Sequence, residues 1–273
     1  MKRKFGIILT FALLVGALLA GCSDGEKKVV KVGVNGSGVP TWEYIKEKAA
    51  DEGIEIELVE FADYVRPNMA LADGDIDINS FQTISYFNSF IEEKDLELSP
   101  IGTTYIAPMG LYSEKYKSAD EIPEGSTIAV PQEATNMGRA LLLLQEAGLI
   151  ELEEGFDGNG DLESITKNPK NIKFEAVVAA QTPRVLPDVA GSVINNGVAV
   201  EAGFIPVEDS IFREGDTATP YINIIAARTE DKDNETYKKI VEIFQTDDVA
   251  DHVNKVYKKS LIPTFVPLSE IGE

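Results

Sequence analysis

Residues 29–53 read VVKVGVNGSGVPTWEYIKEKAADEG. The β-branched run 29–34 predicts a strand, and the glycine-rich turn after it leads to Pro40, which opens a helix that ends before Gly53. Strands that alternate with helix-length segments are typical of α/β proteins with largely parallel sheets. The first structured segment is therefore expected to be the strand–turn–helix unit of an α/β fold.

The same alternation continues to the C-terminus. Further strands are expected at residues 54–58, 76–79, 127–130, 172–179, 191–195 and 221–227, and further helices at 65–72, 135–147, 235–244 and 249–258. We expect residues 29–112 together with 224–273 to form a first lobe, and residues 113–223 a second. Two lobes joined by two crossovers form a hinged architecture with a cleft between them.

The N-terminus has the features of a secretory signal, which we assign to residues 1–21. Three basic residues precede an apolar run over residues 5–20. This run is shorter than the 20 or so apolar residues that span a bilayer, so a signal peptide is a better interpretation than a membrane-spanning anchor.

A lipobox follows at Leu19-Ala20-Gly21-Cys22, which contains the only cysteine of the chain. We expect Cys22 to carry the lipid, including a palmitate-type acyl chain, rather than to be a buried core thiol. Two or more acyl chains anchor a protein stably. Residues 22–28 then form a lipidated polar tether that holds the protein at the extracytoplasmic face of the cell membrane.

The residue inventory argues against several classes of function. The formal net charge is −21, and the signal peptide would take three basic residues with it. Such an acidic body argues against nucleic acid and against a protein that lies on anionic lipid. His252 is the only histidine, and Cys22 carries the only thiol. This inventory argues against Ser–His and Cys–His nucleophiles and against histidine zinc sites. We expect no enzyme, no cofactor and no metal.

A turn over Asp157-Gly158-Asn159-Gly160-Asp161 superficially resembles the start of a calcium loop. Leu162 and Asn168 stand where an EF-hand loop needs a glycine and a bidentate glutamate. We interpret the segment as a surface turn.

Arg139 lies near the expected start of the helix at 135–147, which Thr135 or Asn136 should cap. The helix dipole disfavours a cation there unless a negative group joins it. One interpretation is a ligand carboxylate that receives helix N–H groups and a bidentate guanidinium together. The other is a surface ion pair with a neighbouring Asp or Glu, and both stay open on this basis.

Four aromatic residues follow predicted strands or begin the helices after them. The carboxyl ends of parallel strands meet at one edge of a sheet, where open α/β sheets bind ligands. We expect these aromatic side chains to lie at the cleft: Trp42, Tyr64, Phe81 and Tyr86.

Five stretches, in this order, resemble the NlpA lipoprotein family of methionine-binding receptors of ABC importers. They are DYVRPN at 63–68, NSFQ at 79–82, TNMGRALLLLQ at 135–145, NPKNI at 168–172 and PYIN at 220–223. The resemblance covers the mature chain and implies an α/β, two-lobed periplasmic-binding-protein fold (type II-like) that closes over a free amino acid. It also implies a monomeric receptor whose partners are an ABC permease and its ATPase.

Carried over by position, the resemblance implies that Arg139 binds the α-carboxylate and that Asn223 bonds the polar end of the ligand. Tyr64, Phe81 and Tyr86 would form the wall of the side-chain pocket.

Two positions depart from the pattern of the family. Thr83 stands where methionine-binding relatives usually have a histidine, and Gly197, after Asn195 and Asn196, where they tend to have an asparagine. We place Thr83 and Asn195 in the ligand set and expect methionine or a related amino acid as the ligand. Another amino acid, a methionine-containing dipeptide, and a surface interaction lipoprotein with a vestigial site remain as alternatives.

Overall fold

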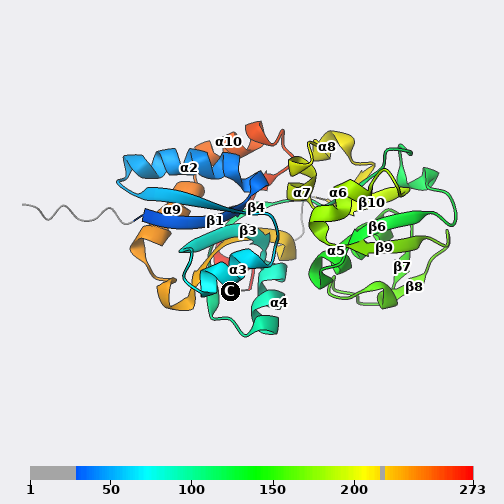
Figure 1. Cartoon of the computed structure of the whole chain (residues 1–273), viewed down its shortest axis with the longest axis horizontal. Coiled ribbons are helices and arrows are strands. Elements are labelled where there is room, and N and C mark those ends of the chain that lie inside the picture. Colours follow the sequence, from blue (N-terminus) through cyan, green and yellow to red (C-terminus); the bar gives the residue numbers. More distant parts are fainter. Residues whose placement is uncertain (1–28, 216–218, 273) are drawn as a thin grey trace, which may run out of the picture.

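The computed structural model describes residues 29–215 and 219–272 (Figure 1). The signal peptide, Cys22 and the tether lie outside the described residues. Within those residues, no helix is long and apolar enough to cross a membrane. Two lobes lie side by side, one built on a six-stranded sheet and the other on a five-stranded sheet.

The sheet of the first lobe has the order β13-β4-β12-β3-β1-β2. Strand β1, next to the edge strand β2, pairs in parallel with β2 and β3, and the central strand β12 runs antiparallel to both β3 and β4. The bounds are β1 (Val29–Asn35), β2 (Glu55–Phe61), β3 (Ile78–Thr83), β4 (Leu98–Ile106), β12 (Ile222–Arg228) and β13 (Ile262–Pro263).

Helices cover both faces of this sheet. On one face α2, α9 and α10 bury the larger apolar core of the lobe, and on the other face α3 and α4 bury a smaller one. The bounds are α2 (Val39–Asp51), α3 (Arg66–Ala72), α4 (Ile84–Lys94), α9 (Glu235–Phe244) and α10 (Asp247–Val256).

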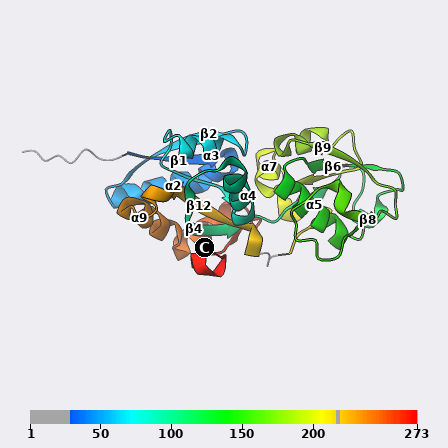
Figure 2. The same ribbon diagram turned by 90° about the horizontal axis from the view of Figure 1, so that it is seen from below.

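The sheet of the second lobe has the order β11-β5-β10-β6-β9, and the long helix α5 packs on it through a leucine-rich face. The strands are β5 (Gly110–Tyr112), β6 (Thr127–Pro131), β9 (Lys173–Val177), β10 (Gly191–Ile194) and β11 (Phe212–Arg213), with a separate pair β7 (Glu151–Leu152) and β8 (Ile165–Lys167). The helices are α5 (Ala134–Glu146), α6 (Thr182–Val185), α7 (Asn196–Glu201) and α8 (Pro206–Asp209). Turned by 90°, the same molecule shows α4 of the first lobe opposite α5 and α7 of the second (Figure 2).

Short 3-10 helices complete the connections. They occupy Gly36–Gly38, Ala119–Glu121, Leu162–Ser164, Ala179–Gln181, Thr219–Tyr221, Thr229–Asp231 and Leu268–Glu270.

The helix ends confirm the sequence prediction closely. Gly53, Gly74 and Gly148 follow α2, α3 and α5 with φ of 77°, 80° and 73°, a left-handed conformation that glycine adopts without steric cost. The predicted helix at 235–244 coincides with α9.

The sheets and the lobe boundaries differ from the prediction. Both sheets are mixed, because the strands that follow each crossover, β5 and β12, run antiparallel to their neighbours. The predicted first lobe ended at residue 112, but β5 belongs to the sheet of the second lobe; the predicted second lobe ended at 223, but β12 belongs wholly to the first. The chain therefore crosses between β4 and β5 and again between β11 and β12. Neither crossover is marked by a glycine- or proline-rich linker.

Candidate ligand-binding site

A cavity lies between the lobes and is lined by residues of both. The first lobe contributes the carboxyl ends of β1 and β3 with the residues that follow them, and part of β4. The second lobe contributes the N-terminal parts of α5 and α7. The cavity therefore forms where the two sheets present their strand ends and helix starts to each other.

Three aromatic side chains form one wall. The ring centroids of Tyr64 and Phe81 are 6.0 Å apart and stacked, and the ring of Tyr86 meets each of them edge-on at 6.3 Å. The hydroxyl of Tyr86 donates to the backbone carbonyl of Tyr64 at 2.8 Å. Burial raises the pKa of both phenols well above the ordinary value, so both stay protonated at neutral pH.

Thr83, the last residue of β3, lines the cavity, where the sequence analysis placed it. It is also the N-cap of α4, because its Oγ1 accepts the backbone N–H of Tyr86 at 3.2 Å. The hydroxyl thus satisfies a helix N–H group that would otherwise lack a partner.

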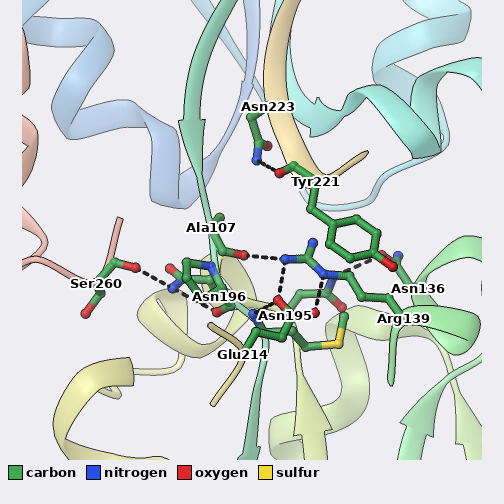
Figure 3. A network of polar contacts seen from close by, with 11 residues as sticks. Ala107, Asn136, Arg139, Asn195, Asn196, Glu214, Tyr221, Asn223 and Ser260 are labelled. Atoms are coloured by element: carbon green, nitrogen blue, oxygen red, sulfur yellow. Dashed lines mark hydrogen bonds and ion pairs between the residues drawn. The ribbon is translucent and has the colours of Figure 1, made fainter. Parts of the chain in front are cut away.

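Arg139 lies in the second turn of α5 and is 4% exposed. It forms a two-point ion pair with Glu214: Nε donates to Oε1 at 2.7 Å and Nη2 to Oε2 at 2.6 Å (Figure 3). Nη2 also donates to the carbonyl of Ala107 at 3.0 Å, and the ring of Tyr221 lies 4.1 Å from the guanidinium carbon. The guanidinium is therefore held on one edge and covered on one face.

Glu214 itself is fixed from a second direction. Its Oε2 accepts the backbone N–H of Met109 at 2.7 Å, and its own backbone N–H donates to the carbonyl of Met109 at 3.0 Å. The side chain is 10% exposed. The carboxylate is therefore held in place by the chain segments around it.

The remaining nitrogen of Arg139, Nη1, has no hydrogen-bond partner among the described residues. Figure 3 shows this end of the guanidinium on the side of Asn223 and Tyr221. Because Arg139 and Asn223 both line the cavity, Nη1 offers two N–H groups to a ligand there.

Two buried amides next to Arg139 are only half satisfied. Asn195 Nδ2 donates to Asn136 Oδ1 at 3.0 Å, while Asn136 Nδ2 and Asn195 Oδ1 have no partner in the part of the chain that the structure describes. A buried polar group without a partner costs about 1–3 kcal/mol. Both residues line the cavity, and one donor and one acceptor of theirs are buried without a partner among the described residues.

Gly197, in α7 of the second lobe, lies close to the first lobe. A Cβ added there would stand 2.6 Å from Oγ of Ser37 and 3.3 Å from Nδ2 of Asn35, both in the first lobe. The glycine therefore allows α7 to approach the turn after β1. The missing side chain at Gly197 thus permits this close packing of the two lobes.

The structure brings together seven of the eight predicted site residues in this cavity: Tyr64, Phe81, Thr83, Tyr86, Arg139, Asn195 and Asn223. The prediction for Trp42 is wrong. Its side chain is 1% exposed and packs in the core of the first lobe, with its ring 5.5 Å from that of Phe244 in α9.

The local prediction for Arg139 also needs correction. Helix α5 begins at Ala134, Glu133 is the N-cap residue without a side-chain cap bond, and Thr135 and Asn136 lie inside the helix. Of the two interpretations of Arg139, the ion pair with a neighbouring acidic residue on the surface is wrong. The arginine does form an ion pair, but its partner is largely buried and lies 75 residues further along the chain.

The sequence prediction of the site did not include three residues that the structure places next to or in it: Asn136, Glu214 and Tyr221. A signal for Glu214 existed in principle, because an arginine inside a buried helix requires a counter-charge. Nothing in the sequence indicated which of the many acidic residues supplies it.

The acidic turn near residue 158 packs against α5. A Cβ on Gly138 would lie 2.1 Å from the carbonyl oxygen of Gly158, so only glycine fits at that position of the helix. The carboxylate of Asp157 accepts the backbone N–H of Asn159 at 3.0 Å.

Within residues 29–215 and 219–272, no group of three or more His, Cys, Asp or Glu side chains is placed to hold a metal ion. His252 lies on α10, outside the cavity lining, and stacks on Tyr44 with ring centroids 4.2 Å apart.

Comparison with known proteins agrees with this architecture. The D-methionine-binding lipoprotein MetQ of Salmonella typhi is 42% identical over 264 residues, which cover 94% of this chain and 97% of that protein. The uncharacterised lipoprotein YhcJ of Bacillus subtilis is 39% identical over 274 residues, 99% of this chain and 97% of that protein.

Among solved structures, a nutrient-binding protein from Burkholderia cenocepacia bound to methionine matches with a TM-score of 0.84 and 40% identity. The match covers 86% of this chain and 100% of that one. The fold is therefore the two-lobed, α/β fold of periplasmic substrate-binding proteins. The family model described as "NlpA lipoprotein" matches residues 30–265, a segment that contains both sheets and the cavity between them. The resemblance noted in the sequence is confirmed, and the chain belongs to the NlpA lipoprotein family.

Proposed function

We propose that this protein is the extracytoplasmic receptor of an ABC importer and binds methionine or a related amino acid between its lobes. The observation that carries the proposal is the division of the cavity into a polar end and an aromatic wall. At the polar end, Arg139 Nη1 and Asn136 Nδ2 are donors, and Asn195 Oδ1 is an acceptor, that lack a partner among the described residues. The wall is formed by Tyr64, Phe81 and Tyr86.

An α-amino acid matches this division. Its carboxylate accepts from Arg139 Nη1 and Asn136 Nδ2, and its ammonium group donates to Asn195 Oδ1 and to the side-chain oxygen of Asn223. Each of these contacts satisfies an atom that is otherwise buried without a partner, or lies at the cavity surface.

The side chain of the ligand extends along the aromatic wall. A thioether is well suited to this place, because sulfur makes favourable contacts with aromatic ring edges. The similarity to a methionine-binding lipoprotein and to a nutrient-binding protein solved with methionine supports methionine as the first ligand to test.

The importer and the anchor belong to the same proposal. A transmembrane permease and an ATPase are the partners that the family implies, and lipid on Cys22 keeps the receptor beside them. Replacement of Cys22 by serine is expected to abolish incorporation of labelled palmitate and to release the protein from the membrane. Undiminished labelling of Cys22→Ser contradicts the anchor.

The ligand is tested by calorimetry on the mature chain produced without Cys22, titrated with the L and D forms of methionine and with other amino acids. Thermal unfolding gives an independent measurement, since ligand at 100 times its dissociation constant adds about 2.7 kcal/mol to the free energy of unfolding. Native mass spectrometry of freshly purified protein detects a retained ligand. A protein that shows neither heat nor a thermal shift with any amino acid is not an amino-acid receptor.

A further inference from the structure

The charge balance of the cavity has one adjustable member. Among the described residues that line the cavity, Arg139 is the only one with a charged side chain. Glu214 neutralises it from behind through the two-point ion pair, with 5% and 10% of the two side chains exposed. The ion pair at the polar end of the cavity is therefore neutral as a unit, although it presents a guanidinium edge.

The place of Glu214 is fixed. Its carboxylate accepts three hydrogen bonds, from Arg139 Nε, Arg139 Nη2 and the backbone N–H of Met109. The two bonds from Arg139 use the Nε–Nη2 edge of the guanidinium and leave Nη1 outside the pair. A ligand carboxylate at Nη1 thus adds to the ion pair and does not need to displace Glu214.

A ligand carboxylate in this position leaves an excess of one negative charge. The neighbouring phenols do not offset it, because burial raises the pKa of Tyr64, Tyr86 and Tyr105 and a phenol is neutral or anionic, never cationic. The amides of Asn136, Asn195 and Asn223 are uncharged. Among the described residues, no lining side chain other than Arg139 is cationic, so a full compensating charge has to come from the ligand.

We propose that Glu214 is a specificity-determining residue: by cancelling the charge of Arg139, it makes the cavity select zwitterions and reject carboxylates that lack an ammonium group. The inference rests on the proposed function, since it concerns how the same cavity distinguishes an amino acid from its anionic analogues. An anion would bring its charge within a few ångströms of the Glu214 carboxylate without compensation, which is costly in a water-poor site.

The test compares two probes, methionine and its 2-hydroxy analogue, in which a hydroxyl replaces the ammonium group. Wild-type protein is expected to bind methionine at least about tenfold more tightly than the hydroxy acid, a difference that one uncompensated charge readily produces. Equal affinity for the two probes overturns the inference without any variant.

The first variant is Glu214→Gln, which keeps the shape of the side chain and removes its charge. The ratio of the two dissociation constants is expected to fall at least about tenfold, because the unpaired Arg139 then balances the anion. Glu214→Asp keeps the charge in a shorter side chain and should keep the ratio, even where both affinities weaken. Glu208→Gln, an exposed change of the same charge in the same lobe, is the matched control and should leave the ratio unchanged.

Each outcome separates the possible failures. If Glu214→Gln is folded by circular dichroism and keeps the wild-type ratio, the inference is wrong while the receptor function stands. If it binds methionine more tightly, Glu214 occupies the ligand's place and the inference is wrong as well. If wild-type protein binds no amino acid, the proposed function fails and the inference with it. If Glu214→Gln does not fold, the wild-type and Glu214→Asp ratios decide.

Discussion

Arg139 and Glu214, 75 residues apart in the chain, meet in a buried ion pair in which Nε and Nη2 of the arginine each donate to a different carboxylate oxygen. The pair holds the guanidinium plane so that Nη1 remains on the cavity side. This geometry makes Arg139 the residue on which the proposed carboxylate contact depends.

Replacement of Arg139 by alanine is expected to weaken amino-acid binding by roughly 2–5 kcal/mol, because a desolvated carboxylate loses its charged partner. Calorimetry on folded protein measures the change. Arg184→Ala removes an exposed arginine of the same lobe and should leave the affinity as it is. An Arg139→Ala variant with wild-type affinity would sink the carboxylate assignment.

The same substitution is expected to lower the free energy of unfolding by about 3–5 kcal/mol, since it leaves Glu214 as an unpaired buried charge. Urea denaturation measures this loss. The double variant Arg139→Met with Glu214→Leu should recover much of it, because replacing both partners removes the uncompensated charge. No recovery would show that the loss comes from packing of the arginine stem.

Replacement of Gly197 by asparagine is expected to weaken binding by about 1–3 kcal/mol. The added side chain would meet Ser37 and hold α7 away from the first lobe. Ser37→Gly in the same chain should restore part of the affinity. An asparagine variant that binds as tightly as wild type, with or without the second change, shows that the lobes accommodate the side chain.

Trp42 is the only tryptophan, so fluorescence reports on it alone. Its burial against Phe244 predicts blue-shifted emission that barely changes when ligand binds. Trp42→Ala should lower the free energy of unfolding by about 3–5 kcal/mol through the cavity it leaves. A large change of fluorescence on binding would contradict this prediction and would show that the core of the first lobe around Trp42 rearranges.

The buried phenols predict how stability depends on pH. Burial raises the pKa of Tyr64, Tyr86 and Tyr105 above the ordinary value of about 10. A raised pKa means that the folded state keeps its phenolic protons when the unfolded state has begun to lose them. The stability contributed by these groups is therefore complete below about pH 10 and is lost as the pH rises above it. Urea denaturation between about pH 8 and about pH 11 measures the loss, and a constant free energy of unfolding contradicts it.

The fold was largely predictable because local signals were strong. Glycines at 53, 74 and 148 ended helices, and the period of the segment 235–244 located α9 to the residue. The antiparallel course of β5 and β12 was not predictable, since a short apolar run carries no information on the direction of its neighbour.

The site was predictable residue by residue but not as a network. Tyr64, Phe81 and Arg139 were identified, whereas the charge partner of Arg139 came from a segment without local pattern. Trp42 was misplaced although a signal was present: Trp42, Ile45 and Ala49 recur at helical spacing and lie on the buried face of α2. Position after a strand was given more weight than that period.

Asn196 is buried at the start of α7, and its side-chain Nδ2 donates to the carbonyls of Ser260 in the first lobe, at 2.9 Å, and of Pro108 in the crossover before β5, at 3.2 Å. These two bonds survive a change in the angle between the lobes only if the axis of rotation passes close to Asn196. For an opening about such an axis, α7 would stay near the axis and the far ends of the lobes would move most.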